Sequence, residues 1–200
     1  MIVFFYKIRR GLISVSTTIL NRIQLRLNNA TIGNSFYTCG MLLVRNFGGH
    51  KAICIGNNVT MNSCRLANPI GGDTKTILYT CEKGKIIIHD NVKLSNVTFF
   101  SRGKIEIGSD TFIGGGTRIY DTDFHSVFPR YRINCMDIEH IPVKEVVVGK
   151  RVFIGSNVLI LKGVHIGDES VIGAGSVVTK NVPQGEIWAG NPAKFIKKLY

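Results

Sequence analysis

Aliphatic residues recur at every sixth position over the C-terminal third of the chain. The members of this series are Val148, Ile154, Ile160, Ile166, Ile172 and Val178. A small or branched residue follows each of them four positions later: Val152, Val158, Val164, Ser170, Ser176 and Val182. A 3.6-residue period would scatter these positions around a helix. Six-residue units instead predict a short strand and a turn that stack into a parallel β-helix, with the aliphatic side chain pointing inward.

Glycine follows four of the six aliphatic residues, at Gly149, Gly155, Gly167 and Gly173. We expect glycine, or the Asn and Asp residues nearby, to take the positive φ of the tight corners. Weaker repeats lie upstream, with a one-residue slip near residues 102–103. Their aliphatic members are Ile32, Ile55, Met61, Ile88, Leu94, Ile107, Ile113 and Ile119. The repeats therefore predict β-helix coils over residues 25–183.

Three segments do not follow the repeat. Residues 2–20 are expected to form a helix within an N-terminal helical segment, 1–24. Residues 121–146 lack six-residue spacing and are expected to leave the stack as one long excursion loop, which in a compact domain is usually functional. Residues 184–200 form a C-terminal extension, in which Phe195, Ile196 and Leu199 with three lysines predict a short amphipathic helix.

The composition narrows the class of protein. Hydrophobic residues make up 44% of the 200 residues and the net charge is +12, which favours an anionic partner. The basic residues are scattered, with the densest groups at the two ends, so we expect no nucleic-acid binding. The five cysteines show no C-x-x-C spacing and are expected to be reduced thiols of a cytoplasmic protein, namely Cys39, Cys54, Cys64, Cys81 and Cys135.

The N-terminus joins a short apolar run, residues 2–6, to Lys7, Arg9 and Arg10. The run is too short to span a bilayer, and the charges follow it, which is the reverse of a secretory signal. Two interpretations stay open. The segment is either a basic amphipathic element that contacts the inner face of an anionic membrane, or a helix packed on its own domain.

The excursion loop opens with Asp121, Asp123 and His125. A histidine can remove the proton of an acceptor hydroxyl during acyl transfer. In an extended segment the three side chains project to one side, so either aspartate could orient the imidazole of His125. The spacing does not say which one. The alternative is that all three are polar groups on the surface of the loop.

The motifs IGSNV (154–158), GAGSVVTK (173–180) and AGNPAK (189–194) resemble the hexapeptide-repeat acyltransferases, and most closely the maltose/galactoside O-acetyltransferase branch. The resemblance is dense over residues 105–198. It implies a left-handed parallel β-helix, a homotrimer, acetyl-CoA as donor and a histidine base in a cleft between subunits. His125 matches the position of that base. The donor-site positions that match are Ser156, Ala174, Thr179, Lys180, Lys194 and Lys197. Beside Ala174, Gly175 lacks a side chain, so we expect backbone groups there to approach the pantetheine arm closely.

The function expected from this resemblance is an acetyl-CoA-dependent O-acetyltransferase that acts on a sugar hydroxyl, with no metal. An N-acetyltransferase for an amino sugar is the near alternative, because the same histidine could serve an amine. A non-catalytic β-helix scaffold is the alternative from another class. The galactoside enzymes' sugar-binding carboxylate has no counterpart near Ser101 and Arg102, so the acceptor pocket is expected to differ.

Overall fold

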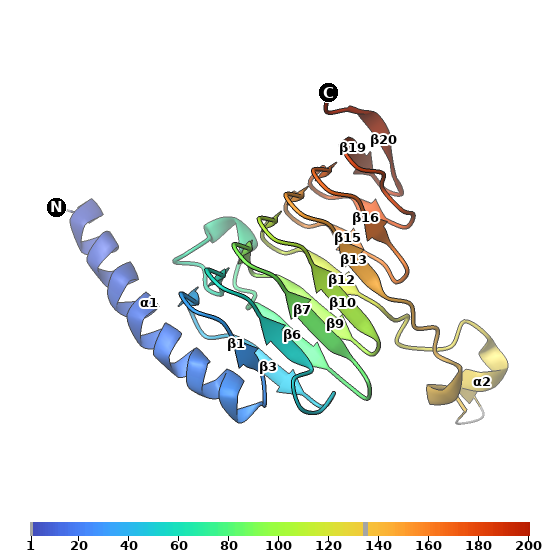
Figure 1. Ribbon diagram of the computed structural model, residues 1–200, viewed down its shortest axis with the longest axis horizontal. Coiled ribbons are helices and arrows are strands. Elements are labelled where there is room, and N and C mark those ends of the chain that lie inside the picture. Colours follow the sequence, from blue (N-terminus) through green and yellow to red (C-terminus); the bar gives the residue numbers. More distant parts are fainter. Residues whose placement is uncertain (1, 134–135) are drawn as a thin grey trace.

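The computed structural model describes residues 2–133 and 136–200, so Met1 and the predicted free thiol of Cys135 lie outside the described residues. Within these residues three sheets of parallel strands stack into a β-helix, and each turn of the chain adds one strand to each sheet (Figure 1). The fold expected from the six-residue repeat is therefore confirmed as a parallel β-helix. The described helices are few and lie outside the stack.

The strands alternate between the sheets in chain order. Sheet A contains β1 (Thr31–Ile32), β4 (Ile53–Ile55), β7 (Lys85–Ile88), β10 (Lys104–Ile107), β13 (Val146–Val148) and β16 (His165–Ile166). Sheet B contains β2 (Tyr37–Cys39), β5 (Thr60–Asn62), β8 (Lys93–Ser95), β11 (Phe112–Ile113), β14 (Phe153–Ile154), β17 (Val171–Ile172), β19 (Glu186–Gly190) and β20 (Ala193–Lys198). Sheet C contains β3 (Leu43–Asn46), β6 (Ile77–Thr80), β9 (Thr98–Ser101), β12 (Arg118–Tyr120), β15 (Leu159–Ile160) and β18 (Val177–Val178).

The aliphatic series stacks inside the coils as predicted. Ile154 lies opposite Ile172 in sheet B, and Ile160 lies opposite Val178 in sheet C. These partners are three repeats apart, so one coil comprises three six-residue units. None of the six aliphatic residues from Val148 to Val178 is more than 2% exposed, and the same holds for the residues four positions later. Both sets of positions therefore fill the core.

The glycines that follow the aliphatic residues have a different role from the one predicted. The nearby Asn157 has a positive φ (56°), as expected of an Asn or Asp at a corner, and so does Glu169 (62°), whereas these four glycines do not. At Gly155 an added Cβ would lie 2.6 Å from the backbone nitrogen of Ala174 in the next coil, and at Gly167 it would lie 2.4 Å from that of Gln184. Glycine is required here because neighbouring coils approach too closely for a side chain.

The chain leaves the stack twice, not once. The predicted excursion runs from the end of β12 at Tyr120 to the start of β13 at Val146 and contains α2 (Pro129–Ile133) and η2 (Ile138–His140). A second excursion, residues 63–76, separates β5 from β6 and contains η1 (Pro69–Gly71). Its two ends are tied together, because Thr76 N donates to Ser63 Oγ at 2.9 Å and Thr76 Oγ1 donates to Asn62 O at 2.8 Å.

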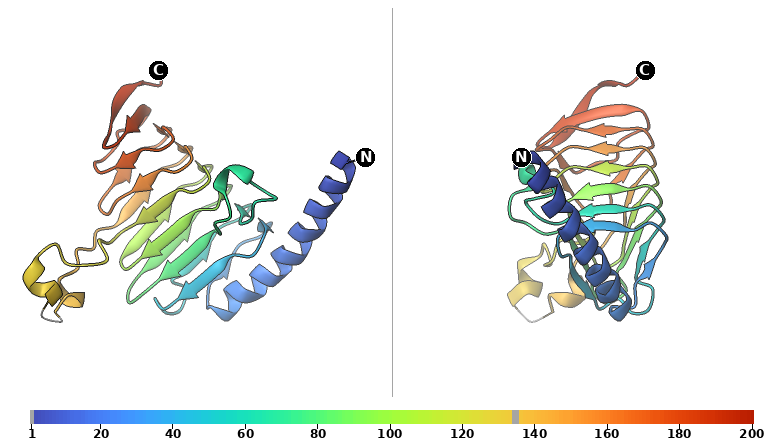
Figure 2. Two further views of the ribbon diagram at one scale, coloured as in Figure 1. Left: turned by 180° about the vertical axis from the view of Figure 1, so that it is seen from behind. Right: turned by 90° about the vertical axis from the view of Figure 1, so that its left-hand side faces the viewer.

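The N-terminal helix is longer than expected. Helix α1 spans Ile2–Leu27 and lies against the N-terminal end of the stack (Figures 1 and 2). Leu25 is fully buried and joins the core of the β-helix, so the last turn of α1 covers the first coil. In the part of the chain that the structure describes, no helix has the length and apolar character needed to cross a membrane.

The predicted C-terminal helix is wrong, because the extension forms a β-hairpin. Strand β19 adds to sheet B beside β17, and β20 then runs antiparallel to β19. The last coil exposes the edge of sheet B, whose unpaired backbone groups can bond an extended segment. The residues from Ala193 to Lys198 therefore pair as a strand at this edge, although the spacing of Phe195, Ile196 and Leu199 is that of an amphipathic helix.

Candidate active site

His125 forms a pair with Asp137 on the excursion loop. The imidazole Nδ1 lies 2.5 Å from Asp137 Oδ2, and the other carboxylate oxygen accepts a hydrogen bond of 2.6 Å from Ser126 N. The backbone N–H of Ser126, and after it the bond with His125, hold the pKa of Asp137 below its ordinary value. An ionised Asp137 favours the tautomer with hydrogen on Nδ1, which leaves the lone pair of Nε2 for a substrate proton. The His125 side chain is 72% exposed, so a ligand can reach it.

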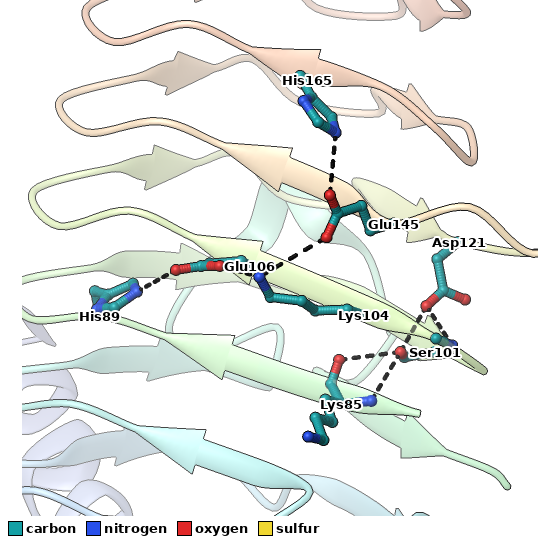
Figure 3. Close-up of polar contacts among 9 residues, drawn as sticks. Lys85, His89, Ser101, Lys104, Glu106, Asp121, Glu145 and His165 are labelled. Carbon is teal, nitrogen blue, oxygen red and sulfur yellow. Dashed lines mark hydrogen bonds and ion pairs between the residues drawn. The ribbon is translucent and has the colours of Figure 1, made fainter. Parts of the chain in front are cut away.

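The two aspartates predicted to orient His125 have other partners. Asp121 is fully buried and accepts hydrogen bonds from Ser101 Oγ, Arg102 N and Gly103 N at 2.7, 2.8 and 2.9 Å. It therefore fastens the start of the loop to the turn after β9 (Figure 3). Asp123 lies 2.6 Å from Lys162 Nζ. The sequence reasoning missed Asp137, because nothing in its spacing, 12 residues beyond His125, marks it as the partner.

A row of aromatic side chains on the outer face of sheet C leads to this loop. It contains the ring that directly follows β3, one ring each from β6 and β9, and the residue before His125: Phe47, Tyr79, Phe100 and Phe124. Neighbouring ring centroids are 5.8, 4.7 and 4.7 Å apart along the row. Tyr120 meets Phe124 edge to face at 5.1 Å. We call these five residues the aromatic row.

Several donor-site positions implied by the resemblance gather on two coils. Gly175 N donates to Ser156 O at 2.8 Å, and Ala174 lies directly beyond Gly155. Thr179, Lys180 and Lys194 line one pocket of about 280 Å³ together with Trp188 and Phe195. Lys197 is exposed on β20 opposite Ile187 and does not line this pocket.

The loop and the pocket lie apart in one chain. Helix α2 of the excursion loop projects from one side of the stack, whereas β19 and β20 lie at the C-terminal end of the stack (Figures 1 and 2). In the single chain, helix α2 of the loop and the hairpin that carries Lys194 therefore lie at different parts of the stack.

Charged side chains form a network across the outer face of sheet A (Figure 3). His89 Nε2 lies 2.7 Å from Glu106 Oε1, and Lys104 Nζ lies 2.7 Å from Glu106 Oε2. Glu145 lies 3.8 Å from Lys104 and 3.7 Å from His165. Lys104, and after it His89, hold the pKa of Glu106 below its ordinary value. We call these five residues the sheet A network.

The remaining histidine of the loop packs on an aromatic ring. His140 stacks on Tyr131 with centroids 3.5 Å apart, and its Nδ1 lies 3.0 Å from Met136 O. Over residues 2–133 and 136–200 there is no group of three or more His, Cys, Asp or Glu side chains that could hold a metal ion.

Comparisons with known proteins agree with the fold and the repeat. The hexapeptide repeat family of succinyl-transferase matches residues 145–180. The chain is 37% identical over 123 residues to the putative lipopolysaccharide biosynthesis O-acetyl transferase of Escherichia coli, a stretch that covers 58% of this chain and 62% of that protein. It is 36% identical to the galactoside O-acetyltransferase of Escherichia coli over 52% of this chain and 49% of that protein.

Solved structures show the same architecture. An N-acyltransferase from Bacillus cereus, in complex with dTDP-4-amino-4,6-dideoxyglucose and coenzyme A, matches with a TM-score of 0.68 and 22% identity, over 90% of this chain and 89% of that one. A hexapeptide-repeat acetyltransferase from Vibrio cholerae, in complex with acetyl-CoA, matches with a TM-score of 0.56 and 25% identity, over 90% and 76% of the two chains.

The fold is that of a hexapeptide-repeat β-helix, and the chain is similar over part of its length to proteins named acetyltransferases. The resemblance to the maltose/galactoside O-acetyltransferase branch is confirmed by the galactoside O-acetyltransferases among the relatives. The chain spans less than two thirds of the length of the curated relatives described above.

Proposed function

We propose that the protein is an acetyl-CoA-dependent O-acetyltransferase that acts on a saccharide hydroxyl. The observation that carries the proposal is the His125–Asp137 pair, exposed on an excursion loop of a hexapeptide-repeat β-helix. Two of the relatives are named O-acetyltransferases, and the Vibrio cholerae structure contains acetyl-CoA. The proposal includes the left-handed winding and the homotrimer that the resemblance implies.

His125 is the general base of the proposed reaction. Nε2 takes the proton of the acceptor hydroxyl while the alcohol oxygen attacks the thioester carbonyl carbon. The resulting tetrahedral oxyanion collapses, the C–S bond breaks, and the imidazolium returns its proton to the leaving thiolate. Asp137 stabilises the imidazolium during the attack, because its carboxylate is bonded to Nδ1. Asp121 and Asp123 act one step away, by fixing the start of the loop.

The donor is proposed to bind along the last coils. Ser156, Ala174 and Gly175 present backbone groups and little side-chain bulk to the pantetheine arm. Lys180 and Lys194, with Thr179 in the same pocket, supply cations for the phosphates of CoA, and Lys197 is proposed as an outer contact. Since the loop with His125 lies away from this pocket in one chain, the proposal places the thioester between neighbouring copies.

The aromatic row supports a saccharide as acceptor. Exposed apolar patches on a soluble protein often mark ligand-binding grooves, and the row ends on Phe124, next to the proposed base. The apolar C–H faces of a sugar ring can pack on such rings while its hydroxyl reaches His125. The relatives include a lipopolysaccharide and a galactoside enzyme by name, which favours a precursor in polysaccharide biosynthesis.

An N-acetyltransferase for an amino sugar is the second candidate. The favouring observation is the Bacillus cereus structure, an N-acyltransferase bound to an amino-sugar nucleotide, whose likeness to this chain concerns the fold. A scaffold without catalysis is the third candidate and leaves the His125–Asp137 pair without a role.

The test is acceptor-dependent release of free thiol from acetyl-CoA with neutral, amino and acidic sugars. The expected result is release with a hydroxyl acceptor that falls by about 10²- to 10⁴-fold in His125→Ala. His140→Ala is the matched control and should retain activity. Release only with amino sugars would support the second candidate. No binding of acetyl-CoA would contradict the enzyme proposal.

The place of action is proposed to be the cytoplasm, at the inner face of the membrane. The basic N-terminus supports this contact, because Lys7, Arg9 and Arg10 are exposed on α1. Lipid-linked saccharides would be within reach of an enzyme held at that surface.

A further inference from the structure

Helix α1 is attached to the β-helix through polar side chains. Ser14 Oγ donates to Thr38 O at 2.6 Å, and Asn21 Nδ2 donates to Thr38 Oγ1 and to Gly40 O, both at 2.9 Å. Thr17 Oγ1 accepts from Gly40 N at 3.1 Å. Ser14, Thr17 and Asn21 are all buried. The helix therefore turns its polar side toward the protein.

The apolar side of α1 faces away from the protein. Six residues spaced three or four apart lie along one line of the helix and are between 44% and 68% exposed: Phe5, Ile8, Leu12, Val15, Ile19 and Ile23. We call these six residues the apolar stripe. It runs for about 27 Å at 1.5 Å per residue. A surface helix normally places such a stripe against the core, so this arrangement is the reverse of the usual one.

The charge of α1 has a single sign. The helix contains Lys7, Arg9, Arg10, Arg22 and Arg26, and its sequence contains no Asp or Glu. Arg9 is exposed beside the apolar stripe, and Arg26, three residues after Ile23, is exposed at its C-terminal end. An apolar face bordered by cations is the pattern of a helix that lies in the interface plane of an anionic bilayer.

We propose that the apolar stripe of α1 enters the headgroup region of an anionic lipid bilayer, with the helix parallel to the membrane and the β-helix on its aqueous side. The inference deepens the proposed membrane contact and is independent of the acetyl transfer. The polar anchorage through Ser14, Thr17 and Asn21 holds the stripe outward, so membrane binding requires no rearrangement of the protein.

A second copy of the chain is a poorer occupant of the stripe. Two α1 helices packed stripe to stripe would bring their cationic side chains close to one another, with no carboxylate on either helix to compensate. Like charges at such a contact are unfavourable. Anionic lipid headgroups supply the missing negative charge.

The test is sedimentation of the full-length protein with vesicles. Vesicles of phosphatidylglycerol and phosphatidylcholine at a molar ratio of about 3 to 7 should bind the protein, whereas vesicles of phosphatidylcholine alone should bind it weakly. Leu12→Gln with Ile19→Gln should reduce the partition coefficient by at least about tenfold, because two apolar side chains leave the bilayer. Phe112→Gln with Phe153→Gln, two exposed rings on sheet B, is the matched control and should bind as before.

Arg9→Gln with Arg26→Gln tests the charge separately and should reduce the preference for anionic vesicles. Circular dichroism checks that each variant keeps its fold. Absence of vesicle binding, equal binding to neutral vesicles, or unchanged binding in the stripe variant would overturn the inference. So would a stripe variant that changes only the oligomeric state. Thiol release with a water-soluble acceptor and no vesicles should be unaffected by the stripe variant, so this result separates the inference from the proposed catalysis.

Discussion

At the scale of the residue, the central feature is which carboxylate meets His125. The alternation of Asp121, Asp123 and His125 favours a partner two or four positions away, whereas in the structure Asp137 lies against the imidazole. The buried carboxylate of Asp121 accepts three hydrogen bonds from residues 101–103, at the end of β9 and in the turn after it. The carboxylate of Asp123 accepts a hydrogen bond from Lys162. Asp137 reaches His125 because the loop folds back, with Ser126 N and His125 binding its two oxygens.

The first prediction concerns Asp137→Asn. The amide oxygen can still accept from Ser126 N, so the loop keeps its shape, but the negative charge beside the imidazolium is lost. We expect kcat for acetyl transfer to fall by about 10²- to 10³-fold with little change in KM for acetyl-CoA. Steady-state thiol release measures both constants. Asp73→Asn, at an exposed ion pair with Arg65, is the control, and a mutant at position 137 with near-normal kcat would contradict the assigned role.

At the scale of the element, stacked strands bring side chains of opposite charge together on the outer face of sheet A. Lys104 and Glu106 lie on β10, while His89 follows β7 and Glu145 precedes β13. These contacts join three successive coils on the face of sheet A. Each pair is partly exposed, so its contribution to stability is modest compared with that of the core beneath it.

The second prediction concerns Glu106→Gln and pH. The folded-state pKa of Glu106 is lowered, so its contribution to stability is present above the ordinary pKa of glutamate and is lost as the pH falls through the folded-state pKa. At pH 7 we expect Glu106→Gln to lower the free energy of unfolding by about 0.5 to 1 kcal/mol. At about pH 3 the difference from the wild type should shrink.

Urea unfolding at both pH values measures this difference. Glu139→Gln, at an exposed residue of η2, is the matched control and should change stability little at either pH. An equal loss at pH 7 and pH 3 for Glu106→Gln would show that the lost stability does not come from the ionised carboxylate.

At the scale of the whole molecule, the candidate base and the candidate donor pocket belong to different regions. The loop with His125 leaves the side of the stack after β12, whereas Thr179, Lys180 and Lys194 gather beside the C-terminal hairpin. The proposed reaction uses both, and we therefore propose that two copies of the chain share the site. A rotationally symmetric assembly would then repeat the same shared site at each interface.

The third prediction is complementation between inactive variants. His125→Ala lacks the base, and Lys180→Glu with Lys194→Glu repels the phosphates of CoA, so each protein alone should be inactive. In a trimer that contains both variants, one interface of the three joins an intact base to an intact pocket, so the mixed assembly should recover roughly a third of the wild-type sites. Thiol release by the doubly tagged, co-purified assembly measures this recovery. No recovery in mixed assemblies would place both parts of the site in one chain.

The sequence by itself determined the repeat, the inward positions and the start and end of the long excursion. The repeat can be recognised in the sequence because each regular coil contains 18 residues. Residues that stack on one another, such as Ile154 and Ile172, are therefore separated by the same number of residues along the chain. The family resemblance rests on the same local motifs. The proposed donor positions from Ser156 to Lys180 also lie within the repeat, whereas Lys194 and Lys197 lie on β20 of the C-terminal hairpin.

Only the tertiary structure decided the features that depend on contacts without a fixed spacing. The partner of His125 is set by how a loop folds back, and the C-terminal hairpin by the open edge of sheet B. The orientation of α1 depends on which of its sides finds hydrogen-bond partners. Thr38 and Gly40 offer backbone groups to Ser14, Thr17 and Asn21, and this bonding turns the apolar stripe outward.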